Sequence, residues 1–514
     1  MLKYIYLPPS GDLWRKLAIN LRDQRIATPV LWMGHRKSDQ FARENFPDCN
    51  VINFNETNKG IFQFKDQEYE KHSKYCQILR EPWFLELKDQ AMRMLDRNDY
   101  FGAFRPVDRE AAFYNLIFRF YTIIEKEKPD ILIVSESPHF ASTLIVYRIC
   151  EYMEIPIVCY MTSLVSPAIF IKSGIDKPPI KLPIGIDQNE FLQASHKEID
   201  GMIYNLLNGE RNPQQPGYML RQFKMERRKR VSRLLKAFRN IFRAALSPIL
   251  PASMQTRSHY GFHGFSAFNN HAGIVSEAIK YITEVRAQRA LTKAYSEICT
   301  SEDSLPEKYA FFPLHYEPER TSNPDGGEWH NQYHAIARLR QLLPDDVAIV
   351  VKEHPSQLGS FVQGFRGRSR FSYETISAIK GVFFTPIDVP SWRIQRNAIL
   401  TCTLTGTAAL EAAITGKPAV LMGHSWFRGC PGITLLTDAV SFEDVLNNTA
   451  DIEDIRAYLY RLIDEYSFFG VIAPSQRKYF AKWFADSSSM EREELGLTKA
   501  TIYAIRALTG ESDG

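Results

Sequence analysis

The chain has 514 residues, of which 45% are hydrophobic and 24% are charged, and it carries a formal net charge of +4 at pH 7. This length and composition exclude a disordered chain and allow two or more domains with large hydrophobic cores. Because the net charge is so small, overall basicity indicates no nucleic-acid partner, and any functional positive charge must be local.

The first third of the chain alternates strand and helix patterns. Residues 3–7, 12–22 and 29–33 predict a strand, a helix and a second strand, which form a βαβ unit. The alternation continues with a helix, a strand, a helix and a strand, at residues 110–126, 131–134, 141–152 and 155–160. Such a series is typical of a parallel sheet covered by helices, so residues 1–200 predict a Rossmann-like N-terminal domain.

The middle of the chain, residues 201–300, predicts a helical linker region with a strongly basic segment. Between Arg221 and Arg243 there are ten basic residues and one acidic residue, and apolar residues recur there at helical spacing. A helix of this kind can lay its apolar face on an anionic membrane while its cations meet the headgroups. The alternative is a solvated basic helix whose apolar side packs on the body of the protein.

The second half of the chain predicts another series of strands and helices. Helices are expected at residues 274–299, 329–343 and 408–415, and strands at residues 309–314, 347–352, 382–384, 398–402 and 419–422. Residues 301–470 therefore predict a second Rossmann-like domain. The tail from residue 451 onward is expected to be helical, and residues 471–514 are predicted to pack back on the N-terminal domain.

Cysteine usage and the chain start predict a cytoplasmic location. The seven cysteines are odd in number and scattered, which is typical of reduced thiols. The first nine residues lack a long apolar signal region, and we find no apolar run long enough to cross a bilayer. Together with the basic segment, this predicts a cytoplasmic protein that can lie on the inner face of the cytoplasmic membrane.

Polar residues gather where strands of the second half end, which is where open α/β sheets bind ligands. His354 follows a predicted strand, and the next residue, Pro355, fixes the turn. The imidazole could donate to a phosphate oxygen or protonate a leaving phosphate, and Lys352 would add positive charge. The alternative is a histidine satisfied by a neighbouring carbonyl.

A second cluster, Thr405-Gly406-Thr407, lies between a predicted strand and a predicted helix. Its hydroxyls and backbone N–H groups could cradle a phosphate at the helix start. Glu411, one turn further, could reach a ribose hydroxyl. The alternative is an ordinary helix cap followed by a surface glutamate. Together with the His-Pro turn, this cluster predicts a nucleotide-sugar site.

A third cluster follows the first strand of the second half and holds His315, Glu317, Glu319 and Arg320. Arg320 suits a diphosphate or a sugar carboxylate. Glu317 or Glu319 could orient sugar hydroxyls or act as a base. The alternative is a network of loop salt bridges, and His315 and Glu317 are the residues we expect to be functional.

In the first half, Glu136 and His139 follow the predicted strand at residues 131–134. A carboxylate at a strand tip can serve as the base for an acceptor hydroxyl. Asp12 is a second candidate, and either carboxylate could instead be a structural cap.

Other chemistries leave little trace in the sequence. We find no phosphate-binding loop ending in Lys-Ser or Lys-Thr, no dinucleotide fingerprint, no zinc-type spacing of Cys or His, and no Gly-x-Ser-x-Gly elbow. Phosphate-loop NTPase, dehydrogenase and serine hydrolase functions are therefore disfavoured, and we expect neither a metal nor a cofactor.

Five short motifs follow one another along the two halves of the chain. They are Pro138-His139, Phe312-Pro313-Leu314 with Pro318-Glu319, Lys352 to Pro355, Thr405-Gly406-Thr407 with Glu411, and Gly416-Lys417-Pro418. In this order they resemble the bacterial capsule polysaccharide biosynthesis proteins, a group similar to the 3-deoxy-manno-octulosonic acid (Kdo) transferases and other GT-B glycosyltransferases. The resemblance covers both halves but not the basic segment. It implies an α/β fold of two Rossmann-like domains that face a cleft.

The resemblance also implies a reaction. The second half would bind a nucleotide-sugar donor, CMP-Kdo-like or other, through His354, Thr405, Thr407 and Glu411, and the first half would present a glycan or glycolipid acceptor. Such relatives are typically independent of metals.

The implied reaction is displacement at the anomeric carbon. Positive charge would stabilise the departing phosphate, and a carboxylate, Glu136 or Glu317, would assist the nucleophile. The candidate cations are His354, Lys352, Arg320 and Arg428. Polyol-phosphate transfer, nucleotide-sugar epimerisation and a non-catalytic, membrane-docked scaffold remain alternatives on the same fold.

Overall fold

The computed structural model describes residues 1–7, 11–34, 36–53, 57, 75–99, 104–183, 189–208, 258–260, 268–270, 274–319, 321–359, 364–437, 440–486 and 488–510. The basic segment from Arg221 to Arg243 and the candidate Arg320 lie outside these residues. The chain divides into two compact units. Unit 1 comprises Met1–Gly201, Tyr260–Ala267 and Leu459–Gly514, and unit 2 comprises Met202–His259 and Phe268–Tyr458.

Unit 1 is built on a mixed sheet of seven strands in the order β15-β6-β5-β4-β1-β2-β3. The strands are β1 (Leu2–Leu7), β2 (Ala27–Gly34), β3 (Asn50–Asn53), β4 (Ile131–Val134), β5 (Ile157–Thr162), β6 (Ala168–Lys172) and β15 (Ser467–Phe469). From β3 to β5 neighbouring strands are parallel, whereas β6 is antiparallel to both β5 and β15. The chain reverses its direction across the sheet between β1 and β4.

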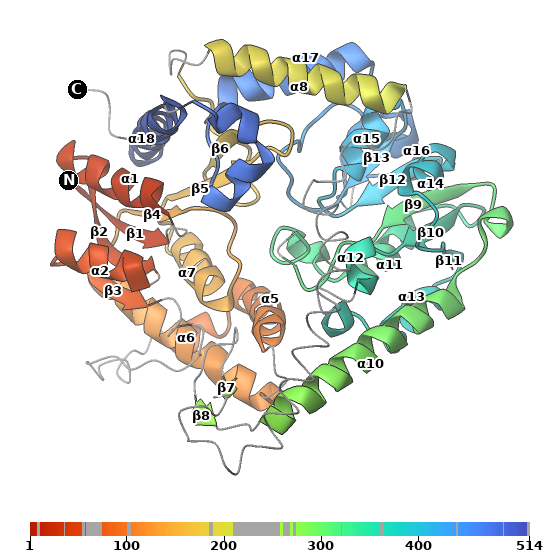
Figure 1. Ribbon diagram of the computed structural model, residues 1–514, viewed down its shortest axis with the longest axis horizontal. Helices are drawn as coiled ribbons and strands as arrows, with labels where there is room; N and C mark the ends of the chain where they lie inside the picture. Colours follow the sequence, from red (N-terminus) through yellow and green to blue (C-terminus); the bar gives the residue numbers. More distant parts are fainter. Residues whose placement is uncertain are drawn as a thin grey trace. The chain divides into compact units, whose positions relative to one another are not determined.

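Helices cover both faces of this sheet (Figure 1). One face packs on α5 (Pro82–Asn98), α6 (Pro106–Glu127) and α7 (Ala141–Tyr152). The other face packs mainly on α1 (Asp12–Asp23) and α18 (Ser488–Thr509). The remaining helices are α2 (Arg36–Asn45), α4 (Tyr75–Ile78), α8 (Asn189–Leu207), which continues into unit 2, and α17 (Ile452–Tyr466), which begins there.

Unit 2 contains a sheet of six strands, all parallel, in the order β11-β10-β9-β12-β13-β14. The strands are β9 (Tyr309–Pro313), β10 (Ala348–Lys352), β11 (Val382–Phe384), β12 (Leu400–Thr403), β13 (Ala419–Leu421) and β14 (Ile433–Leu435). All five residues of β10 are buried, as expected of a central parallel strand. Because the chain runs outward from β9 to β11 and then returns to β12, the topological switch point lies between β9 and β12.

Helices also cover both faces of the second sheet. One face packs on α10 (Ile274–Ile298), α11 (Gln332–Leu342) and α13 (Arg370–Ser377), and α10 lies beside α13 (Figure 1). The other face packs on α14 (Ser391–Asn397) and α15 (Ala408–Ile414). The short α12 (Pro355–Leu358) and α16 (Phe442–Asn447) lie in connections, and a separate ribbon joins β7 (Ser258–Tyr260) to β8 (Phe268–Asn270).

The predicted α/β class with two Rossmann-like sheets is confirmed. The strands predicted in unit 1 pair in parallel, and the sheet also holds β6, which was not predicted and is antiparallel to β5. One detail of the prediction is wrong. The tail is not wholly helical, because β15 interrupts it and pairs with β6. No helix in the described ranges is both long and apolar enough to cross a membrane.

Candidate functional site

The predicted residues of unit 2 lie where β9, β10 and β12 end at the carboxyl edge of the sheet. His315 follows β9, His354 follows β10, and Thr405 follows β12. Since β9 lies between β10 and β12, the three connections are neighbours at the switch point. This is the edge where open α/β sheets bind their ligands.

His315 joins the two strands of the switch point directly. Its Nε2 accepts the backbone N–H of Thr405 at 3.3 Å and the hydroxyl of Thr403 at 3.1 Å. Since Nε2 is an acceptor, the neutral ring carries its proton on Nδ1. The pKa of His315 is lowered to about 3, first by burial and then by the positive charges of His354 and Arg368. The imidazole is therefore uncharged at neutral pH.

His354 caps the short helix α12. Its Nδ1 accepts the backbone N–H of Ser356 at 3.2 Å, so the neutral ring carries its proton on Nε2. Burial lowers the pKa of His354 to about 4, against an opposing effect of Glu319. At neutral pH the ring is an uncharged hydrogen-bond donor, which suits a phosphate oxygen. An anion held beside it would raise its pKa.

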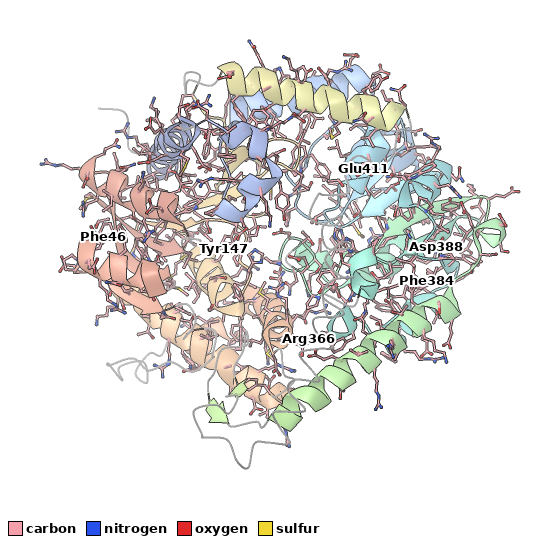
Figure 2. All side chains as sticks on the ribbon, viewed as in Figure 1. Phe46, Tyr147, Arg366, Phe384, Asp388 and Glu411 are labelled. Carbon is pink, nitrogen blue, oxygen red and sulfur yellow. The ribbon has the colours of Figure 1, made fainter. Side chains whose placement is uncertain are left out.

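Lys352 does not offer its charge to this edge. Its side chain is buried, and Nζ donates to the backbone carbonyls of Pro386 at 3.2 Å and Ile387 at 2.7 Å. Burial lowers the pKa of Lys352 to about 8, against the opposing charge of Asp388, which Figure 2 shows with Phe384 near the end of β11. In this arrangement Lys352 fixes the turn after β11.

The Thr405-Gly406-Thr407 segment is closely packed. The Thr405 hydroxyl donates to the carbonyl of Thr321 at 2.9 Å, and the Gly406 N–H donates to Thr403 Oγ1 at 3.3 Å. A Cβ at Gly406 would lie 2.8 Å from Thr403 Oγ1 and 3.4 Å from His315 Cε1, so a glycine is needed there.

The third residue of the predicted phosphate cradle, Thr407, binds Glu411, the residue predicted to reach the ribose. The Thr407 hydroxyl donates to Glu411 Oε1 at 2.9 Å, with Glu411 on α15 (Figure 2). Burial raises the pKa of Glu411, and the hydrogen bond from Thr407 partly offsets this effect.

Glu317, predicted as a base, is held in a buried ion-pair network. Its carboxylate accepts from the Arg368 guanidinium and from Gln332 Nε2, the latter at 2.7 Å. Arg368 also donates through Nε to Glu353 Oε2 at 3.3 Å, and Glu353 is fully buried. Sequence reasoning missed Arg368, Glu353 and Gln332.

Arg428 lies in the connection that follows β13. Its Nη1 donates to His424 Nδ1 at 2.9 Å, and its carbonyl accepts the Tyr458 hydroxyl at 2.8 Å. The connection packs against residues 325–326, because a Cβ at Gly423 would lie 2.6 Å from the Asp325 carbonyl.

The two candidates of unit 1 lie together after β4. His139 Nε2 and Glu136 Oε1 are 3.2 Å apart, and both side chains are partly exposed. Arg97, on α5, donates to the carbonyl of His139. The connection after β4 is next to the end of β1, where this sheet has its own switch point.

The structure thus brings some predicted residues together and separates others. His315, Thr405 and Gly406 form one contact group, and Glu317 and His354 join it through the Arg368–Glu353 network. Thr407 and Glu411 form a separate pair, Lys352 is turned inward, and Glu136 and His139 belong to unit 1.

Comparisons with known proteins give a family match and several structural likenesses. A family model described as "Capsule polysaccharide biosynthesis protein" matches residues 208–470, just over half of the chain. No curated protein matches the sequence.

Among solved structures the chain is similar to KpsC of Thermosulfurimonas dismutans, a beta Kdo 2,7 transferase, with 13% identity and a TM-score of 0.26 over 66% of this chain and 78% of that one. It is also similar to UDP-GlcNAc 2-epimerase of Methanocaldococcus jannaschii, with 11% identity and a TM-score of 0.23 over 89% of this chain and 98% of that one.

Proposed function

This chain belongs to the capsule polysaccharide biosynthesis protein family, and from that premise we propose that it is a glycosyltransferase. The donor is a nucleotide sugar, CMP-Kdo-like or other, and the acceptor is a growing bacterial surface polysaccharide. The observation that carries the proposal is the group of His315, His354 and Thr405 at the switch point of unit 2. In this group the uncharged imidazole of His354, which carries its proton on Nε2, suits the phosphate of a nucleotide sugar.

The proposed reaction is a displacement at the anomeric carbon of the donor. The oxygen of an acceptor hydroxyl attacks this carbon, the bond from the carbon to the phosphate oxygen breaks, and the nucleotide leaves with the bonding electrons. His354 Nε2–H donates to the phosphate, and its hydrogen bond strengthens as negative charge develops there. The hydroxyl proton passes to a carboxylate, for which we propose Glu136 of unit 1.

The other candidates take binding or positioning roles in this proposal. Thr405, Gly406, Thr407 and Glu411 line the nucleotide side, and His139 lies on the acceptor side. We assign Glu317 to positioning instead of base catalysis, because its carboxylate is already paired with Arg368. Arg320 and Arg428 are the remaining cations proposed for the phosphate or the sugar.

We further propose that the protein works in the cytoplasm without a metal and that the segment from Arg221 to Arg243 docks it on an anionic membrane. Ten basic residues and a helical apolar spacing support the docking.

The proposal is tested by nucleotide binding and product analysis. Wild type, His354→Ala and the control His334→Ala, which removes an exposed histidine of α11, are heated with CMP, CDP, UDP, GDP and their sugar conjugates. Stabilisation by one nucleotide family, lost only in His354→Ala, is the expected result.

Products formed with the stabilising donor then separate the reactions. Release of the nucleotide that depends on a glycan acceptor supports glycosyl transfer. Sugar interconversion without an acceptor would support an epimerase, and transfer of a polyol phosphate with release of CMP a polyol-phosphate transferase. Glycan binding with no nucleotide binding would favour a scaffold.

A further inference from the structure

A buried network of charged and amide side chains connects the ends of β9 and β10. Glu353 is fully buried, the Arg368 side chain is 5% exposed, and the Glu317 side chain is 15% exposed. Arg368 bonds to both carboxylates, and the Tyr373 hydroxyl donates to Glu353 Oε2 at 2.9 Å. Relative to apolar residues of the same volume, buried ion pairs contribute little net stability, so this network calls for another role.

The network makes hydrogen bonds to backbone groups of the two site histidines, His315 and His354. Glu353 Oε1 accepts the backbone N–H of His354 at 2.6 Å. Arg368 Nη2 donates to the carbonyl of His315 at 3.2 Å. Gln332 completes the hold on His315, because its amide accepts the His315 N–H at 2.8 Å and donates to the His315 carbonyl at 3.1 Å.

Two glycines allow the segment that carries Arg368 to approach this closely. A Cβ at Gly364 would lie 1.8 Å from the carbonyl oxygen of Gln357, and a Cβ at Gly367 would lie 2.2 Å from that of Glu317. The turn η6 (Gly364–Arg366), in which Figure 2 labels Arg366, therefore packs directly on the backbone of the β9 and β10 connections. The local chain is built to bring Arg368 between the two carboxylates.

We propose that Arg368 and Glu353 are positioning residues that hold His315 and His354 each in a single orientation and tautomer. This inference rests on the proposed function for its use, because oriented imidazole donors are what a donor phosphate requires. The network acts on the backbones of the histidines, and neither residue needs to touch the substrate.

His315 gives the sharpest test of this role. Its contacts with Thr405 and Thr403 require the proton on Nδ1, which is the minor tautomer of a free histidine side chain. A ring released from its position should return toward the Nε2–H form. Nitrogen chemical shifts of ¹⁵N-histidine in the full-length protein distinguish the two forms without any ligand, and His315→Gln and His354→Gln assign the signals.

Three variants test the network. Arg368→Lys keeps the charge but cannot bond both carboxylates and the His315 carbonyl at once. Tyr373→Phe keeps the buried ring and removes only the hydrogen bond to Glu353, so it serves even where Arg368→Lys does not fold. The control is Arg370→Ala, two residues away, whose side chain is 67% exposed and bonds to Glu374 on the surface.

We expect wild type and Arg370→Ala to show the Nδ1–H form of His315, and Arg368→Lys to show a mixture with the Nε2–H form. In Tyr373→Phe the same signal should broaden or shift. With the stabilising donor, kcat/KM should fall at least about tenfold in Arg368→Lys and remain unchanged in Arg370→Ala.

Unchanged tautomers in folded Tyr373→Phe and Arg368→Lys would overturn the positioning role. Released tautomers in a protein that turns over no nucleotide sugar would support positioning while the proposed function fails, so the two failures are distinguishable.

Discussion

Protonation of His315 should destabilise unit 2 strongly at acid pH. The pKa of this imidazole is about 3 in the folded protein, because burial and the nearby positive charges disfavour its charged form. The ordinary value is near 6.5 in an unfolded chain. Between these two pH values the unfolded chain binds a proton at His315 and the folded protein does not. The stability present above about pH 6.5 is therefore lost progressively as the pH falls toward 3.

The size of this effect follows from linkage. One pKa unit corresponds to about 1.4 kcal/mol, so moving from pH 7 to pH 4 should remove roughly 3 kcal/mol of unfolding free energy through His315 alone. His315→Gln removes the titration but keeps an acceptor, because the Gln side-chain carbonyl can reach the Thr405 N–H in place of Nε2. From pH 7 to pH 4, wild type should therefore lose roughly 3 kcal/mol more unfolding free energy than His315→Gln.

The assay is urea unfolding at pH 7, 6, 5 and 4. Unfolding of unit 2 is monitored by the hydrogen exchange of peptides that contain β9 and β12. Groups that do not interact with His315 titrate equally in both proteins and cancel in the difference. His334→Gln is the control for removing a histidine from a helix surface. A wild-type-minus-His315→Gln difference that stays constant from pH 7 to pH 4 would refute the assignment of a buried, neutral imidazole at the switch point.

Four further predictions concern the site and its surroundings. Gly406→Ala should weaken nucleotide binding at least about tenfold in calorimetry, because a methyl group there displaces Thr403 and His315. The control Gly201→Ala should bind nucleotide normally, because no atom lies within 4 Å of a Cβ at that position. Equal affinities of the two variants would contradict the packing argument. Lys352→Met should retain donor affinity within about threefold, because its ammonium group faces backbone carbonyls, and a much larger loss would make Lys352 a ligand. Deletion of residues 221–243 should abolish sedimentation with anionic vesicles and leave nucleotide binding intact, and unchanged sedimentation would reject the docking helix. Transfer should persist in excess EDTA, and an activity restored only by added Mg²⁺ or Mn²⁺ would contradict a metal-independent reaction.

Most strands of the two sheets could be predicted from the sequence because their apolar runs are short, continuous and bounded by turn residues, whereas β3, β6 and β14 were not predicted. The strand predicted at residues 382–384 and the helix predicted at residues 141–152 have the same bounds in the structure. The strand β15 could not be predicted in this way. It has three residues inside an otherwise helical tail, and only its pairing with β6, which is remote in sequence, makes it a strand.

The site shows the same division between local and long-range information. His315 and His354 could be placed at strand ends because each follows a predicted strand closely. The sequence did not show that the Lys352 side chain points into the protein, because its direction depends on the backbone carbonyls of the turn after β11. Glu353 and Arg368 are 15 residues apart along the chain and share no periodic pattern with their partners. Their closely packed glycines, Gly364 and Gly367, were the local signal that could have indicated a close approach.

The charges at the carboxyl edge of the unit 2 sheet suit a proposed donor site that favours reaction over tight substrate binding. The charge of Arg368 is balanced by two carboxylates, and Lys352 is turned toward backbone carbonyls. His315 and His354 are both uncharged at neutral pH, since burial lowers the pKa of each. Neutral donors bind a donor phosphate modestly in the ground state. In the proposed reaction their hydrogen bonds strengthen as the phosphate gains negative charge on leaving. Stabilisation that grows along the reaction raises kcat, whereas fixed cations at the same positions would hold substrate and leaving group alike.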